Sequence, residues 1–253
     1  MSIITQPARR SAAFWTLLSP GDRVLWFVAA AAAALVLWGI AVWRAHMPLW
    51  GATTIAIGVL AVPATMKWRT DFQRYGLTAV LLSMLLVMQG FHTLEHFSQV
   101  IQYYVFNNPP YFSQGLLSTL NNEWVHFTWN WIVVGFLVYL IRNGLRNRWA
   151  WVLLVWAFAH SLEHTYMLIR YLRIVRELSA LGVTAPPVAG SLPGILGRDG
   201  WLALSSFCGR IPGLTTSSRI AIHFWWNFGE MALLLAAVWV SAPKILEKSK
   251  TKE

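Results

Sequence analysis

The segment FHTLEHFSQVIQY, residues 91–103, decides the fold because it recurs as AHSLEHTYMLIRY at residues 159–171. Both copies contain the pattern H-x-L-E-H, followed at matching positions by Ile and Tyr. On a helix, the two histidines and the glutamate of this pattern project from the same side, because residues three and four positions apart are neighbours. The recurrence therefore predicts two similar helices, each carrying one stripe of potential metal ligands.

A second pattern follows each copy: HFTWN at residues 126–130 and HFWWN at residues 223–227. Glu123 precedes the first of these patterns by three residues, whereas Glu230 lies three residues beyond the second. The repeated unit is thus a pair of helices used twice, with its extra carboxylate at opposite ends. We assign repeat 1 to residues 76–142 and repeat 2 to residues 148–242.

The composition indicates an integral membrane protein. Apolar residues make up 57% of the 253 positions, and charged residues make up only 12%. The net charge of +10 is that of a membrane protein with basic loops, because Lys and Arg lie between the apolar segments and at the chain ends; we expect no nucleic-acid partner. A single cysteine, Cys208, excludes a metal site built from several cysteines.

Six apolar segments are long enough to cross a bilayer, and they lie at residues 24–43, 49–66, 77–106, 122–141, 149–172 and 220–240. The expected fold is an all-α integral membrane protein in which the third to sixth transmembrane helices, two parallel repeats, form a four-helix metal-binding bundle. Residues 1–23 form a cytoplasmic N-terminal segment, residues 24–75 two transmembrane helices, and residues 243–253 a basic tail. The connection at 183–217, with Pro186 and Pro187, has no predicted role.

The distribution of Lys and Arg predicts the orientation of these spans. Basic residues are more abundant in the segments that share a side with the two termini, which predicts that both termini are cytoplasmic. The expected location is a bacterial inner membrane or a plasma membrane. In this topology all four histidine-containing motifs fall in the outer half of the bilayer. We therefore expect a metal site near the external face.

Carboxylates inside the spans need a partner, because each costs about 2.5 to 3.5 kcal/mol in insertion scales. No Lys or Arg lies within the motifs, so protonation, histidinium partners or bound cations remain. Six of the seven histidines belong to these motifs. The candidate ligands exceed the needs of one ion and predict two or three divalent metal ions: His92, Glu95, His96, Glu123, His126, His160, Glu163, His164, His223 and Glu230.

Four amide side chains share the same helix faces as the candidate ligands. We expect Asn130, Asn227, Gln89 and Gln99 to hydrogen-bond the ligands rather than bind metal themselves. The tryptophans of the H-F-x-W-N patterns are interpreted as residues that pack between helices or face lipid.

Iron is the expected metal, with Zn, Mn or Cu as alternatives and haem as a less favoured one. Inward-facing Glu and Glu-x-x-His spacings on four helices are similar to the plan of di-iron bundles, and the H-x-x-x-H spacing is similar in kind to histidine boxes of membrane desaturases, although their H-x-x-H-H boxes are absent. The leading function is an oxidoreductase that hydroxylates or desaturates a lipophilic substrate. The substrate would enter from the membrane lipid, and an electron-donor protein would supply the electrons.

Three other functions remain open. H-x-x-E-H is the inverted zincin spacing, which suggests a membrane zinc hydrolase with Glu as general base. Histidines on different spans could ligate haem in a b-type cytochrome. A polar stripe through a helix bundle also suits a metal or proton carrier.

Overall fold

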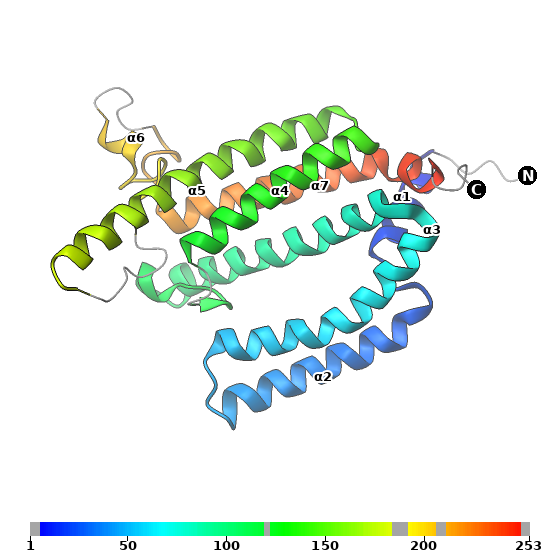
Figure 1. Cartoon of the computed structure of the whole chain (residues 1–253), viewed down its shortest axis with the longest axis horizontal. Coiled ribbons are helices and arrows are strands. Elements are labelled where there is room, and N and C mark those ends of the chain that lie inside the picture. The colour runs from blue at the N-terminus through cyan, green and yellow to red at the C-terminus, as the bar shows by residue number, and fades with distance from the viewer. Residues whose placement is uncertain (1–5, 119–121, 184–191, 206–210, 249–253) are drawn as a thin grey trace, which may run out of the picture. The chain divides into compact units, whose positions relative to one another are not determined.

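The computed structural model describes residues 6–118, 122–183, 192–205 and 211–248, and every regular element within them is a helix (Figure 1). The long helices are α2 (Val24–Trp43), α3 (Leu49–Val100), α4 (Glu123–Asn143), α5 (Arg148–Ala180) and α7 (Arg219–Lys248). The short helices are α1 (Gln6–Leu18) and α6 (Trp201–Leu204). Pro186, Pro187 and the end of the basic tail lie outside the described residues.

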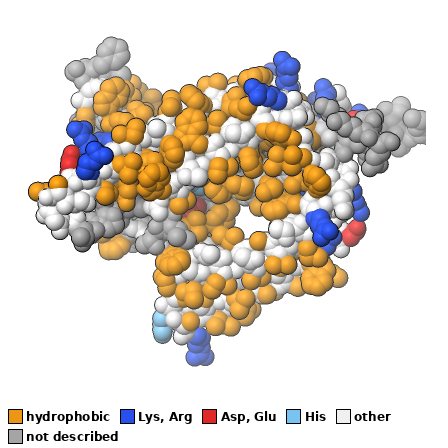
Figure 2. All heavy atoms as spheres, in the orientation of Figure 1, with side chains coloured by type: hydrophobic (Ala, Val, Ile, Leu, Met, Phe, Trp, Pro, Cys, Tyr) orange, Lys and Arg blue, Asp and Glu red, His pale blue; other side chains and the backbone are white. Residues whose placement is uncertain are grey.

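Five helices of the described chain are long and apolar enough to cross a membrane, as expected of an α-helical membrane protein. Large apolar side chains on these helices are exposed; Leu25 keeps 83% of its surface, Val155 70% and Ile169 62%. Hydrophobic side chains also predominate on the face that Figure 2 shows. An exposed apolar surface of this extent is typical of contact with lipid.

The predicted second and third spans lie in the two arms of α3, which are two helices joined across a kink. Gly76 interrupts its helical geometry with φ 75° and ψ −179°, which bends the chain between two arms. A turn of π-helix, Ile101–Val105, continues the second arm. Leu49–Val105 contains 57 residues, or roughly 85 Å of helix, which is far more than the ~30 Å of hydrocarbon. Whether this helix crosses twice, giving six spans in all, stays a prediction.

The helices group into two compact units. The first comprises Met1–Gly90, Phe136–Leu154 and Met231–Glu253. In it, the carbonyl of Leu17 at the end of α1 accepts hydrogen bonds from Lys67 Nζ at 2.9 Å and Ser83 Oγ at 2.8 Å. Carbonyls in the last turn of a helix have no partner within that helix, so the two arms of α3 provide it. The end of α1 is thereby fixed to both arms.

Asn147 performs two tasks at the start of α5 in the same unit. Its Oδ1 accepts a hydrogen bond from the backbone N–H of Ala150 at 3.1 Å, which is the geometry of an N-cap. Its Nδ2 donates to the carbonyl of Ala237 at 2.9 Å and to Ser241 Oγ at 2.8 Å. The residue that starts α5 therefore also joins it to α7.

The second unit comprises Phe91–Gly135 and Val155–Glu230 and contains the predicted ligands. Trp131 of α4 donates to Thr165 of α5 at 3.1 Å, and Trp156 of α5 donates to the carbonyl of Trp226 in α7 at 3.0 Å. Two of the motif-carrying helices, α4 and α7, are therefore each in direct contact with α5.

Replacement of Gly76 by Ala should destabilise the protein by about 1 to 3 kcal/mol, because its positive φ with extended ψ is open almost only to glycine. Gly58→Ala in the same helix is the matched control, since a Cβ there meets open space. We expect Gly58→Ala to be neutral or slightly stabilising. Thermal unfolding in detergent measures both, and equal transition temperatures for the two variants would contradict the assigned backbone strain.

Candidate metal centre

Six buried histidines form two groups in the second unit. One group contains His92 and His96 of α3 with His126 of α4, and the other contains His160 and His164 of α5 with His223 of α7. Within each group, one ring nitrogen from each histidine lies within 4.8 Å of the others. Nitrogens around a tetrahedral ion lie about 3.4 Å apart, so shifts of about 1 Å would close each group on an ion. We call these groups triad 1 and triad 2.

The triads follow the sequence patterns. Each triad takes two histidines from one H-x-L-E-H pattern and a third from the H-F-x-W-N pattern that comes next in the chain. Helix starts place the third histidine in both cases. Asn122 Oδ1 accepts from the N–H of Val125 at 3.0 Å at the start of α4, and Ser218 Oγ accepts from the N–H of Ala221 at 3.2 Å at the start of α7. These caps fix the turns that carry His126 and His223.

Hydrogen bonds orient two imidazoles of triad 1. The Nδ1–H of His96 donates to Oε1 of Gln99 at 2.8 Å, and the Nδ1–H of His126 donates to the carbonyl of Asn122 at 3.1 Å. Both acceptors are oxygens, so the proton is on Nδ1 and the lone pair of the neutral ring is on Nε2. Metal-binding histidines have this arrangement, in which the second nitrogen donates to an oxygen.

In triad 2, the ring of His160 has a carboxylate partner, which is a stronger acceptor than the amide and carbonyl oxygens in triad 1. Its Nδ1 lies 2.8 Å from Oε1 of Glu230, and both side chains are buried. Its Nε2 lies 3.1 Å from Nε2 of His164. This separation is close to that of two neighbouring ligands on one ion. Glu230 therefore hydrogen-bonds a histidine of triad 2 and belongs to neither three-histidine group, and metal ligation by Glu230 stays a prediction.

Four imidazole nitrogens have no hydrogen-bond partner among the described residues although they are buried: Nε2 of His92, His96 and His223, and Nδ1 of His164. Buried polar atoms in proteins are nearly always hydrogen-bonded. A cation bound by each triad would accept one lone pair from each imidazole, and would thereby satisfy the Nε2 atoms of His92, His96 and His223 without further protein groups. The donor set therefore fits two bound metal ions.

Glu95, the glutamate of the first H-x-L-E-H pattern, is bonded to a loop. Its Oε2 accepts from the N–H of Leu116 at 2.8 Å and its Oε1 from the N–H of Leu117 at 3.0 Å. Gly115 is required at this approach, because a Cβ there would overlap the carboxylate and because its φ is +75°. Two backbone donors offset much of the cost of burying this carboxylate.

Glu163 of the second pattern repeats this arrangement with another loop. Its Oε1 accepts from the N–H of Ile195 at 3.0 Å and from that of Leu196 at 3.3 Å. A Cβ on Gly194 would overlap its carboxylate. The sequences Gly-Leu-Leu and Gly-Ile-Leu therefore serve the same purpose, and their similarity was the signal that sequence reasoning missed. Metal ligation by Glu95 or Glu163 stays a prediction.

Glu123 has a basic partner that the sequence analysis did not assign to it. Arg219, the first residue of α7, donates from Nη2 to Oε1 of Glu123 at 2.7 Å and from Nη1 to the carbonyl of Leu192. The expectation that protonation, histidinium or metal alone would balance the carboxylates is thus corrected by an arginine at a helix end. The other oxygen of Glu123 is buried without a hydrogen-bond partner among the described residues, which keeps it a candidate ligand.

A tryptophan ring contacts the first histidine of each H-x-L-E-H pattern, tilted by 32° in the case of Trp129 and stacked in the case of Trp226. The rings of Trp129 and His92 have centroids 5.2 Å apart, and so do those of Trp226 and His160, which are nearly parallel at 6°. Both tryptophans occupy the fourth position of H-F-x-W-N. Their interpretation as packing or lipid-facing residues therefore missed a contact with the centre. Trp225, by contrast, is 59% exposed.

The predicted amide partners have different positions. Asn130 and Asn227 donate at 2.9 Å to the carbonyls of His126 and His223, four residues earlier in their own helices, rather than to ring nitrogens. Gln99 bonds a ring, as predicted for these amides. Gln89 is buried in the other unit, and its role stays a prediction.

The triads adjoin each other. The rings of His126 and His164 are parallel within 2° with centroids 4.8 Å apart, and His96 stacks on His223 at 5.9 Å. A pocket of about 260 Å³ lies nearby and is lined by Arg219 and by Gly194 and Leu196 of the loop that Glu163 binds. The arrangement is thus a candidate dinuclear centre with a pocket beside two of its supporting groups. No family model, curated protein or solved structure matches the chain.

Gly115→Ala and Gly194→Ala should each lower the unfolding temperature by about 3 to 10 °C, since a Cβ would displace a buried carboxylate from its loop. Gly135→Ala on α4 is the control, because a Cβ there meets open space. Thermal unfolding of the three variants decides between a specific requirement at the loops and a general sensitivity to Gly→Ala substitution. A decrease for Gly135→Ala as large as the others would contradict the loop assignment.

Proposed function

We propose that the protein is an integral membrane metalloprotein in which two duplicated helical hairpins each hold one transition-metal ion, and that the ion pair makes it an oxidoreductase for a lipophilic substrate. The observation that carries the proposal is the pair of adjoining, buried three-histidine groups with four unbonded ring nitrogens among the described residues. Three imidazoles per ion leave coordination positions open for a reacting molecule.

The donor set favours copper over the iron expected from the sequence. Imidazole suits Cu, Zn and Fe, whereas bundle-type iron pairs are bridged by glutamates. Here the described hydrogen bonds of Glu95 and Glu163 go to loop amides, and that of Glu230 goes to His160. Copper also binds N-donor sites most tightly among divalent first-row ions. We therefore rank a copper pair first and an iron pair, with Glu123 as an added ligand, second.

A redox-active pair supplies electron transfer and activation of oxygen when bound. The chain's own residues hold and enclose it. Gln99, Asn122 and Glu230 set the tautomers of three ligands, and Trp129 and Trp226 cover two imidazoles and exclude water from that side. An apolar substrate would reach such a centre from the lipid-facing helix surfaces.

The structure gives less support to two of the alternatives. A zinc hydrolase would need Glu95 or Glu163 as general base, yet each carboxylate accepts two backbone hydrogen bonds that hold it against a loop. A b-type haem would separate its axial histidines by the porphyrin plane, whereas His126 and His164 are in direct contact. Transport of metal ions remains the principal alternative.

The membrane arrangement is also a proposal. Six crossings follow if Gly76 marks the end of one span and the start of the next, because each arm of α3 is long enough to cross. Both termini would then be cytoplasmic and the histidines would lie toward the external face of a bacterial inner or plasma membrane. An electron-donor protein and membrane lipid are the proposed partners.

Protein purified and loaded with Cu or Fe should contain about two metal ions per chain, measured by elemental analysis. His126→Ala should reduce the content to about one ion, as should His223→Ala, because each removes one ligand from a different triad. His46→Ala is the control, since His46 is exposed and belongs to neither triad. Firm binding of zinc alone would contradict the oxidoreductase, and retention of two ions in both variants would contradict the ligand assignment.

Glu230→Gln should lower the affinity for one of the two ions by about 10- to 100-fold, because the carboxylate makes His160 a better ligand than a neutral amide would. Glu177→Gln is the matched control; it makes the same charge change on an exposed pair with Arg173. Competition with a chelator of known affinity, followed by absorption, measures both sites. Equal loss from the two sites would show that Glu230 acts on the fold as a whole and not on triad 2.

A further inference from the structure

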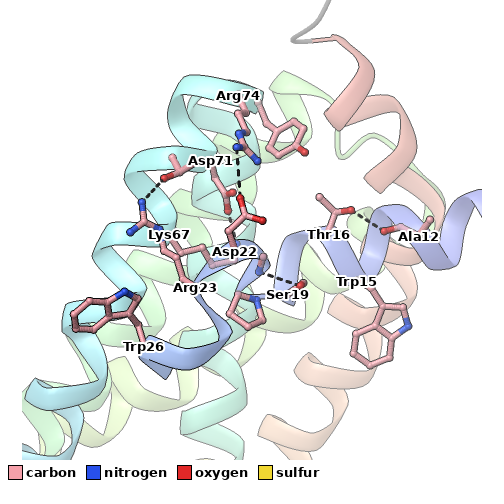
Figure 3. A pocket seen from close by; sticks show the side chains of 14 residues that line it. Ala12, Trp15, Thr16, Ser19, Asp22, Arg23, Trp26, Lys67, Asp71 and Arg74 are labelled. Atoms are coloured by element: carbon pink, nitrogen blue, oxygen red, sulfur yellow. Dashed lines mark hydrogen bonds and ion pairs between the residues drawn. The ribbon is translucent and has the colours of Figure 1, made fainter. Parts of the chain in front are cut away.

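A second polar site lies in the first unit and includes no histidine of the triads. It is a pocket of about 550 Å³ lined by residues of α1, of the turn before α2 and of the first arm of α3. Figure 3 shows three basic side chains around it, Arg23, Lys67 and Arg74, together with Asp22 and Asp71. The metal-binding proposal makes no use of these groups.

Lys67 is already neutralised within the protein. It forms a buried ion pair with Asp71, and its ammonium also donates to the carbonyl of Leu17 at 2.9 Å. Its charge therefore holds α1 against α3 and is not available to a ligand. Because Asp71 is paired with Lys67, its carboxylate would repel a bound anion only weakly.

The two arginines keep most of their donor capacity. Arg23 donates from Nη2 to Thr70 Oγ1 at 3.0 Å, a neutral partner that uses one of its five N–H groups. Arg74 lies 3.9 Å from Asp22 with both side chains exposed, 60% and 94% respectively, so this pair is weak. Two guanidinium groups thus face one pocket with donors that can bind a phosphate.

The position of the pocket selects the source of the phosphate. The apolar helix α2 begins at Val24, directly after Arg23, and α3 bends at Gly76, directly after Arg74 and Tyr75. These ends mark the limit of two apolar segments. Trp15 and Trp26 line the pocket and are 60% and 63% exposed, as is typical of indoles at a bilayer interface.

We propose that this pocket binds the headgroup of an anionic phospholipid, with Arg23 and Arg74 on the phosphate and the acyl chains along α2. Leu25 and Val28 beside Arg23 are 83% and 61% exposed, which provides an apolar surface for an acyl chain. Thr70 and Tyr75 line the same pocket and supply neutral hydrogen-bonding groups. Basic pockets next to transmembrane helices recognise lipid headgroups in this way.

Native mass spectrometry of the full-length protein in detergent, titrated with phosphatidylglycerol, tests the proposal. The wild type should retain one phosphatidylglycerol with at least tenfold preference over phosphatidylcholine, and Arg23→Gln with Arg74→Gln should lower its affinity about tenfold or more. Arg69→Gln is the matched control, because Arg69 lies on the same helix, is exposed and does not line the pocket.

The outcomes separate the explanations. Loss in the double variant with retention in Arg69→Gln supports the site. The proposal is overturned if the wild type and the double variant bind phosphatidylglycerol equally, or if all the variants lose it equally. It is also overturned if the wild type binds inorganic phosphate but no phosphatidylglycerol. Unchanged helical circular dichroism and unchanged metal content confirm that the variants are folded, and neither measurement depends on lipid binding.

Discussion

The centre depends on the satisfaction of polar groups inside apolar helices. Imidazoles and carboxylates gather where the described structure is most buried, so each needs a partner that water would otherwise provide. The carboxylates find theirs in backbone amides, an arginine and a histidine. The imidazoles are only partly satisfied in this way, and the remaining nitrogens converge in two groups. The carboxylates therefore stabilise the site, whereas the imidazole nitrogens are the groups left to bind a ligand.

The histidines could be predicted from the sequence because their spacing is local. H-x-L-E-H puts two imidazoles on one side of a helix, and the recurrence of the pattern identifies them as a set. The partners of the glutamates could not be predicted in the same way. Glu163 is bonded to Ile195 and Leu196, more than thirty residues away in a loop without periodic signal. Sequence spacing indicates what shares a helix face, but not what a loop brings to that face.

The spans show the same division. The apolar run before Arg44 predicts α2 with its observed ends, because a long apolar segment between charged residues has no competing structure. The gap between the apolar segments 49–66 and 77–106 predicts a connection, yet the polar residues after position 66 continue the helix as far as Gly76. Lys67 and Asp71 lie one turn apart and form an ion pair that favours a helix, so polarity did not imply a loop there.

The ion pair between Arg219 and Glu123 joins the start of α7 to the start of α4, and hence one hairpin to the other. Each of these residues lies within four positions of a histidine from a different triad. Ordering of one triad around its ion would therefore restrict the helix start that carries part of the other. Binding of the first ion would then lower the entropic cost of ordering the second triad. We therefore expect the two ions to bind cooperatively rather than independently.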